Sequence, residues 1–125
     1  MSSYNQALRK PNTAGLIVKE IVVDCAGVAT GDLDTGLTVP AGKFCVGAYL
    51  SNPADDLTSG GSATLAVKVG PTAVVSATAI ASVKGSGVAT EDATPDYSAT
   101  ARKVYLTVAT ASLTAGTAVI KVAYL

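Results

Sequence analysis

The chain has 125 residues, and its nine basic and nine acidic side chains leave no formal net charge. A chain of this length forms one domain and is long enough to bury a core without disulfide staples. Without a basic excess, it is not expected to bind nucleic acid through phosphate contacts. Zero net charge also protects a free monomer poorly against association, which favours work in an assembly.

Apolar residues make up 49% of the sequence, but aromatic residues only 5%. Small and β-branched residues therefore dominate, as is typical of tightly spaced β-sheets. The mean hydropathy of +0.42 is high for a chain with 14% charged residues. Either part of the surface is buried against partners, or the many alanines raise the average.

The first 15 residues are polar and contain a short basic cluster next to a proline. Proline removes a backbone donor and favours an extended conformation before it, so we expect an N-terminal arm (1–15) followed by one β domain (16–125). The segment has no apolar stretch and is not expected to be a signal peptide, and no run elsewhere predicts a membrane-spanning helix. An arm of this kind orders on a neighbouring subunit or frays without a role. The candidate partner-binding residues are Tyr4, Arg9, Lys10 and Pro11.

The first half of the domain predicts two long strands. Leu16–Asp24 is rich in β-branched residues, and Lys43–Ser51 is mostly apolar. Ala26–Gly36, between them, is dense in Gly and Asp and predicts a loop. Ser51–Gly61 contains Asn-Pro and Gly-Gly and predicts a second break.

Ser62–Val69 alternates, with Leu65, Val67 and Val69 on one face, and predicts a strand. After a Gly-Pro turn, Ala73–Val83 is expected to return as its hairpin partner. Helix is the rival interpretation of that segment, because Ala is the best helix former. Its Val, Thr and Ile content favours strand.

Lys84–Thr100 predicts a long loop or weakly structured excursion. Val104–Ala109 alternates again, and Thr117–Leu125 is expected to end the domain as a strand. Many strands separated by turns, without a convincing helix, predict an all-β fold. The specific expectation is an antiparallel β-sandwich, jelly-roll-like in arrangement.

Two segments resemble each other. Leu37–Leu50 and Leu113–Leu125 both begin with Leu-Thr, pass through Ala-Gly and end in Ala-Tyr-Leu. They differ in length by one residue, which would reverse the facing of side chains along a strand. We therefore expect two strands of one sandwich rather than a duplicated domain, with a bulge at Gly47 that restores the phase.

The chain is poorly equipped for catalysis or metal binding. It contains no His, the commonest general base and metal ligand, so no enzyme activity, cofactor or metal site is expected. Cys25 and Cys45 are expected to be reduced and buried, since disulfides are rare in a cytoplasm. Asp32 and Asp34 resemble the start of a calcium loop, but no acidic residue closes it. Asp55 and its acidic neighbour predict a solvated loop tip.

Two longer stretches carry a family resemblance. GGSATLAVKVGPTAVVSATAIASVKGSG (Gly60–Gly87) and KVYLTVATASLTAGTAVIKVAYL (Lys103–Leu125) resemble small virion structural proteins of tailed bacteriophages, of the head-decoration or head-fibre type. The likeness covers about half of the chain and involves packing and turn motifs. It implies a β-sandwich that is bound to the shell, and it implies no catalytic residues.

We therefore expect a structural virion protein, made in the host bacterial cytoplasm, that binds and stabilises the assembled shell. Its expected partners are the major capsid protein or other virion proteins, and copies of itself, with a trimer as the first expectation. One alternative is a tail or baseplate component. Another is a glycan-binding β-sandwich module, for which Tyr97 is the plausible stacking platform.

Overall fold

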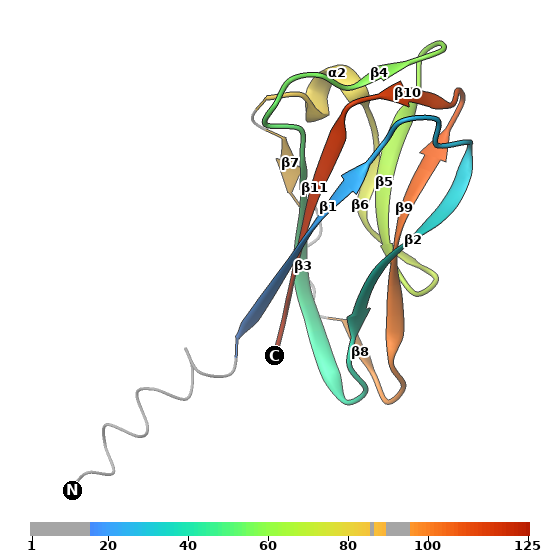
Figure 1. The fold of residues 1–125 in the computed structure, drawn as a ribbon. Helices are drawn as coiled ribbons and strands as arrows, with labels where there is room; N and C mark the ends of the chain where they lie inside the picture. Colours follow the sequence, from blue (N-terminus) through green and yellow to red (C-terminus); the bar gives the residue numbers. More distant parts are fainter. Residues whose placement is uncertain (1–15, 86, 90–95) are drawn as a thin grey trace, which may run out of the picture.

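The computed structural model describes residues 16–85, 87–89 and 96–125, and these form two facing β-sheets (Figure 1). The first sheet has the order β1-β11-β3-β7, with β8 also paired to β3. The second has the order β2-β9-β5-β6, and β10 pairs with β4 separately. Every ladder between these strands is antiparallel.

The elements have the following bounds. The first sheet contains β1 (Ile17–Asp24), β3 (Lys43–Ser51), β7 (Val88–Ala89), β8 (Asp96–Ser98) and β11 (Thr117–Tyr124). The second contains β2 (Gly31–Val39), β5 (Thr64–Val69), β6 (Thr72–Ala79) and β9 (Arg102–Ala109). The remaining elements are β4 (Thr58–Ser59), β10 (Leu113–Ala115) and one helical turn, α2 (Ile80–Val83).

The all-β, antiparallel fold predicted from the sequence is confirmed, and the jelly-roll-like connectivity stays a prediction. The core lies between the two sheets and follows the expected alternation. Along β5, Leu65, Val67 and Val69 are fully buried, while Lys68 between them is partly exposed. Strand β9 repeats this pattern on the adjacent strand. The largest fully buried side chains include Leu50, Leu57, Leu65, Leu106, Leu113 and Ile120.

The predicted loop over Ala26–Gly36 is wrong in its second half, because β2 begins at Gly31 and pairs with β9. Period-two burial explains the strand: Thr35 is buried, and its hydroxyl donates a 2.7 Å hydrogen bond to the carbonyl oxygen of Val104. The Gly-rich signal instead marks a shift in register after Asp34. There Gly36 adopts a positive φ of 87°, which suits glycine.

Two other segments differ in part from their predictions. Within Ala73–Val83, the strand β6 ends at Ala79, and the last four residues form α2, so each rival interpretation describes one portion. The stretch Lys84–Thr100 was expected to be loop, but its described residues include β7 and β8, which pair with β3. These short strands extend the first sheet beyond what its sequence pattern indicates.

The two echoing segments end in neighbouring strands, β3 and β11, that pair with each other. The register passes from Ala123 opposite Gly47 to Tyr124 opposite Cys45, so Val46 is an extra residue on β3. The bulge expected at Gly47 is therefore confirmed. It turns Cys45 into the core together with the residues beyond the bulge, which an unbulged strand would not do.

Asn52 fastens the loop after β3 to the start of β11. Its side chain is fully buried and donates hydrogen bonds to the Asp56 carboxylate (2.8 Å) and to the carbonyl oxygen of Thr117 (2.6 Å). Its amide oxygen accepts from the backbone N–H groups of Asp56 (2.8 Å) and Leu57 (3.0 Å). Asp56, expected at a solvated loop tip, is exposed but takes part in this network, which lowers the pKa of its carboxyl group.

Candidate docking surface

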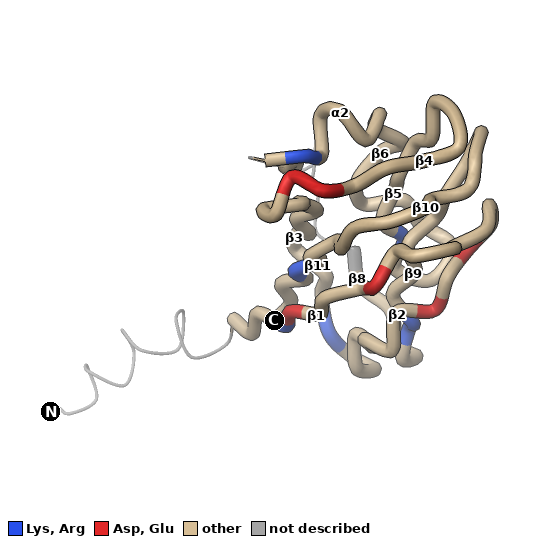
Figure 2. The backbone as a smooth tube through the Cα atoms, turned by 45° about the horizontal axis from the view of Figure 1, so that its top comes forward, with Lys and Arg blue, Asp and Glu red and all other residues tan. Residues whose placement is uncertain are grey.

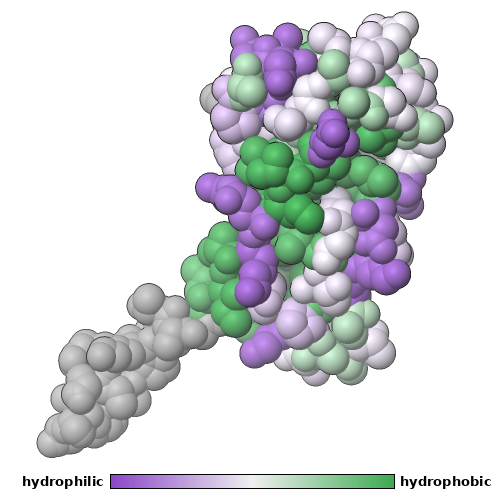
Figure 3. Space-filling view, viewed as in Figure 1, coloured by the Kyte–Doolittle hydropathy of each residue, from purple (hydrophilic) through white to green (hydrophobic). Residues whose placement is uncertain are grey.

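The outer face of the first sheet is unusually apolar. We call this surface, formed by the outward side chains of β1, β11, β3 and β8, the apolar face. Cross-strand register places Val22 beside Val119 and Val18 beside Ala123, and alternation along β1 adds Leu16 to the same side. Figure 3 shows hydrophobic residues gathered along the course of β1, interrupted by hydrophilic ones.

An aromatic row continues this face near the C-terminus. Phe44 on β3 lies opposite Tyr97 on β8, with ring centroids 4.9 Å apart and tilted by 49°. On its other side, Phe44 exchanges two backbone hydrogen bonds with Leu125. The large hydrophobic side chains that are exposed among the described residues all belong to the apolar face. They are Leu16, Val18, Val22, Phe44, Tyr97 and Leu125, each between 43% and 59% exposed.

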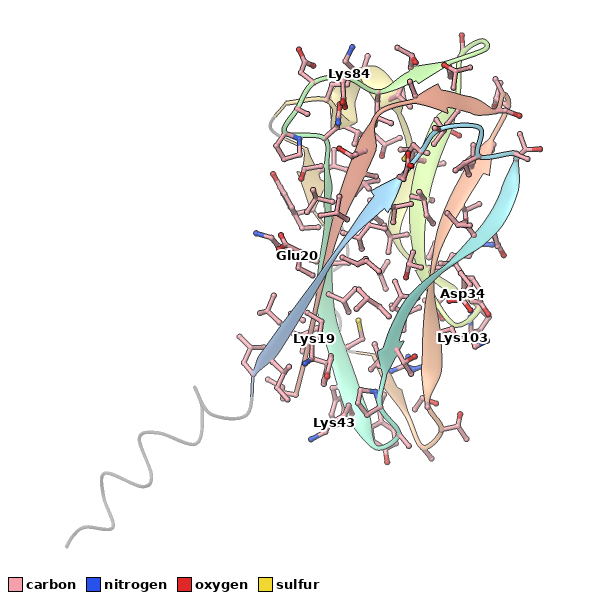
Figure 4. All side chains as sticks on the ribbon, in the orientation of Figure 1. Lys19, Glu20, Asp34, Lys43, Lys84 and Lys103 are labelled. Carbon is pink, nitrogen blue, oxygen red and sulfur yellow. The ribbon has the colours of Figure 1, made fainter. Side chains whose placement is uncertain are left out.

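One ion pair lies in the middle of the apolar face. Glu20 and Lys121 are register partners, their charged atoms are 3.8 Å apart, and both side chains are about half exposed. Figure 4 shows Glu20 pointing away from the sandwich. Beside the pair is a shallow hollow of about 260 Å³. Its lining comes from β1, β3 and β11: Val18, Gly47, Ala48, Tyr49, Lys121 and Ala123.

The outer face of the second sheet is polar, and its charges are matched on neighbouring strands. Asp32 accepts a 2.6 Å hydrogen bond from the Thr107 hydroxyl and lies 3.4 Å from the Lys68 ammonium. Asp34 lies 3.3 Å from the Lys103 ammonium, and Figure 4 shows these two residues side by side, on the side of the sandwich away from Glu20. This surface, the polar face, suits contact with water.

These contacts account for the two aspartates that resembled a cation loop. The Thr107 hydrogen bond, with a contribution from Lys68, lowers the pKa of Asp32. The backbone N–H of Gly36, followed by Lys103, lowers the pKa of Asp34. Both carboxylates therefore have protein partners, and in the described part of the chain no three His, Cys, Asp or Glu side chains form a cluster that could hold a metal.

The two cysteines are buried and unpaired with each other, as predicted. Burial, helped by the negative charge of Asp24, raises the pKa of Cys25 to about 11. A thiol with so high a pKa is a poor nucleophile at neutral pH. Among the described residues, Figure 2 shows blue and red positions spread over the backbone without a region of a single sign.

The structure brings together residues that the sequence did not single out. The predicted partner-binding residues of the arm lie outside the described residues: Tyr4, Arg9, Lys10 and Pro11. Tyr97 was singled out as a glycan platform in a loop, but it lies in β8 and contacts Phe44. The missed signal was in Leu16–Asp24, where apolar residues occupy both alternating sets. A strand with that pattern is usually covered on both faces.

Strand β1 is an edge of the first sheet and, among the described strands, pairs with β11. Lys19 lies on the core-facing side of its alternation, opposite Val122, but is exposed. A charge on the inward side of an edge strand discourages another strand from pairing there. The free surface of β1 is therefore its outward side and not its edge.

The sequence matches no protein-family model and no curated protein. The fold, in contrast, has clear likenesses among solved structures. A chain of the acidic stable capsid structure of Helicobacter pylori bacteriophage KHP30 has a TM-score of 0.61 and 12% identity, covering 88% of this chain and 86% of that one. A chain of the capsid of Ralstonia phage GP4 has a TM-score of 0.61 and 21% identity, covering 88% and 82%.

A chain of the cyanophage Pam1 capsid asymmetric unit is also similar, with a TM-score of 0.52 and 24% identity over 88% of this chain and 85% of that chain. At these identities the likenesses establish a shared fold along most of the chain. In the described residues, no helix has the length and apolar character needed to cross a bilayer.

Proposed function

We propose that this protein is a structural component of a tailed-bacteriophage virion, and specifically a capsid decoration protein that binds and stabilises the assembled shell. The main support is the likeness in fold to chains of three phage capsids, each over 88% of this chain. The resemblance of Gly60–Gly87 and Lys103–Leu125 to small phage virion proteins of the head-decoration or head-fibre type also supports a role on the head.

The two-sided surface agrees with this role. A protein that works in an assembly needs one surface that loses water on contact with a neighbouring chain and another that stays hydrated. The apolar face provides the first, since burying its exposed side chains under a neighbouring chain is favourable. The polar face provides the second, with its aspartates already paired to lysines.

Decoration would stabilise a shell by mass action. A ligand that binds the assembled state alone stabilises it by about 2.7 kcal/mol per site when its free concentration is roughly 100 times its dissociation constant. Many copies on one particle add to this effect. No reaction is required of the protein.

The proposal is tested with shells of the encoding phage prepared without this protein. We expect added protein to sediment with the shells and to raise the temperature of their calorimetric transition. Electron cryo-microscopy of complete virions is expected to place the chain on the head. Failure to co-sediment together with an unchanged transition would contradict the decoration role, and density on the tail would establish the tail or baseplate alternative.

The glycan-binding alternative is weaker, because it rests on one plausible stacking platform, Tyr97, which is half exposed beside Phe44. A glycan array is expected to give no specific signal. Specific binding that is lost on replacing Tyr97 by Ala would establish that alternative.

A further inference from the structure

We propose that the apolar face pairs with the same face of a second copy of this chain, around a two-fold axis. This inference goes beyond the proposed function and does not depend on it. It is carried by three observations: where the exposed hydrophobic residues lie, how the central charges on that face are arranged, and which side chains face each other across the two strands.

The two central charges of the apolar face complement themselves, while Asp24, at the end of β1, lies opposite Thr117. Its central cation and anion, Lys121 and Glu20, are adjacent and half exposed. A two-fold axis parallel to the strands, between β1 and β11, places Glu20 of each copy over Lys121 of the other. The two pairs then form a cluster of four alternating charges, so each face satisfies the other, as an isologous interface requires.

The apolar side chains fit the same symmetry. Register partners remain in the same row under this axis, so Val22 of one copy faces Val119 of the other, and Val18 faces Ala123. Val18 and Val22 are 57% and 59% exposed, and the small Ala123 lies at the hollow beside Val18. Ala123 therefore leaves room for Val18 of the other copy, whereas Val22 meets a side chain of its own size in Val119.

The opposite surface does not offer this arrangement. On the polar face, Asp32 and Asp34 already have close partners in Lys68, Thr107 and Lys103. Packing two such faces would remove water from several charges at once, which is unfavourable without new hydrogen bonds. The apolar face is thus the better self-association surface of the two.

The size of the overlap sets the expected strength. Eight residues of β1 at ~3.3 Å each and two strands at ~4.8 Å spacing give roughly 250 Å² of flat sheet per copy. Stable complexes bury about 800 Å² per partner. The pair is therefore expected to be weak in dilute solution and to form where copies are concentrated.

Charge reversal provides the decisive experiment. Glu20→Lys gives a face with two cations, and Lys121→Glu gives a face with two carboxylates. Sedimentation velocity from about 10 to about 500 µM is expected to show the wild-type mass rising toward a dimer and each variant remaining a monomer. An equal mixture of the two variants is expected to regain dimers, and added salt is expected to weaken them.

A matched pair of substitutions tests the apolar rows. Val18→Glu on the apolar face is expected to abolish the dimer, whereas Thr38→Glu, an exposed β2 position beside Lys103 on the polar face, is expected to leave it unchanged. Valine and threonine have the same shape, so both variants replace similar side chains by the same charge. Unchanged circular dichroism and melting temperature verify that each variant is folded.

Several results would overturn the pairing. These are a wild-type mass that stays monomeric up to the highest concentration, a trimer mass as first expected from the sequence, or no recovery in the mixture of charge variants. A monomeric protein whose shell binding is lost in Val18→Glu would assign the face to the shell instead. Conversely, dimers that do not bind shells would contradict the proposed function and leave the pairing intact.

Discussion

Replacing Asn52 by Ala tests whether the buried amide network holds the β3–β4 loop against β11. The substitution removes four hydrogen bonds and leaves the buried N–H of Leu57 and the carbonyl of Thr117 without these partners. A net hydrogen bond contributes about 1 kcal/mol, and an unsatisfied buried group costs about 1–3 kcal/mol. We therefore expect the free energy of unfolding to fall by about 3–4 kcal/mol.

That loss is a large part of the stability of a small domain, which is typically about 5–15 kcal/mol. Unfolding entropy for a chain of this length is about 0.26 kcal/mol/K near 60 °C, so the melting temperature is expected to fall by about 10–15 °C. Urea unfolding followed by circular dichroism gives the free energy directly, and a thermal scan gives the melting temperature.

Thr58→Ala is the matched control. It removes an exposed hydrogen bond of 2.6 Å between the hydroxyls of Thr58 and Thr114, close to the same loop. Water replaces that bond, so the expected loss is under about 1 kcal/mol. If Asn52→Ala also costs less than about 1 kcal/mol, the network does not fasten the loop and the reasoning is refuted.

Three further predictions concern backbone, thiol and carboxylate. Gly116→Ala is expected to lower the melting temperature far more than Gly27→Ala. Both glycines have positive φ. A Cβ added at Gly116 would lie 2.7 Å from the Asp56 carbonyl oxygen, whereas a Cβ added at Gly27 would have no atom within 4 Å. Cys25 is expected to resist a disulfide reagent at pH 8, since its pKa is about 11, and to react after denaturation. Thr107→Val is expected to raise the pKa of Asp32, because the hydrogen bond that lowers it most is lost. An NMR titration measures this pKa.

The sign of the Asp32 effect follows from its direction. The pKa of the Asp32 carboxyl group is lower in the folded state than its ordinary value of 3.8. Such a group stabilises the fold at pH values above the unfolded-state pKa, and this contribution disappears as the pH falls through the folded-state pKa. Thr107→Val should therefore destabilise the protein at pH 7 and much less at about pH 2. An equal difference at both pH values would contradict this.

The reactivity and glycine predictions have their own contrary outcomes. Rapid labelling of Cys25 in the folded protein would mean that its thiol is reached from solvent. Equal melting temperatures for the two glycine variants would mean that strain at a positive φ, and not the close approach to the loop, decides the loss.

The strands that the sequence predicted well are those whose alternation alone determines which face is buried. Leu65, Val67 and Val69 are apolar against Ala and Lys, and the pattern needs no knowledge of the neighbouring strand. Gly47 could be predicted as a bulge because two similar segments differ by one residue. In both cases the decisive information is local.

Strand β2 was missed because its information is distant. Asp32 and Asp34 favour turns by themselves, yet here lysines on β5 and β9 pair with them. Asn52 presents the same problem, since an Asn-Pro step indicates a turn, while its partner Thr117 lies 65 residues further along the chain. The apolar face was within reach of prediction only through the doubly apolar pattern of Leu16–Asp24.

Lys19, on the inward side of the edge strand β1, also limits how the chain can associate at high concentration. A strand added along β1 would cover the ammonium group of Lys19. The ammonium would then lose hydrating water without gaining a partner, which is unfavourable. Growth of long β-ribbons from this margin is thereby discouraged, even when the chain is abundant. A chain with this edge is therefore protected against open-ended strand addition at β1 even at high concentration.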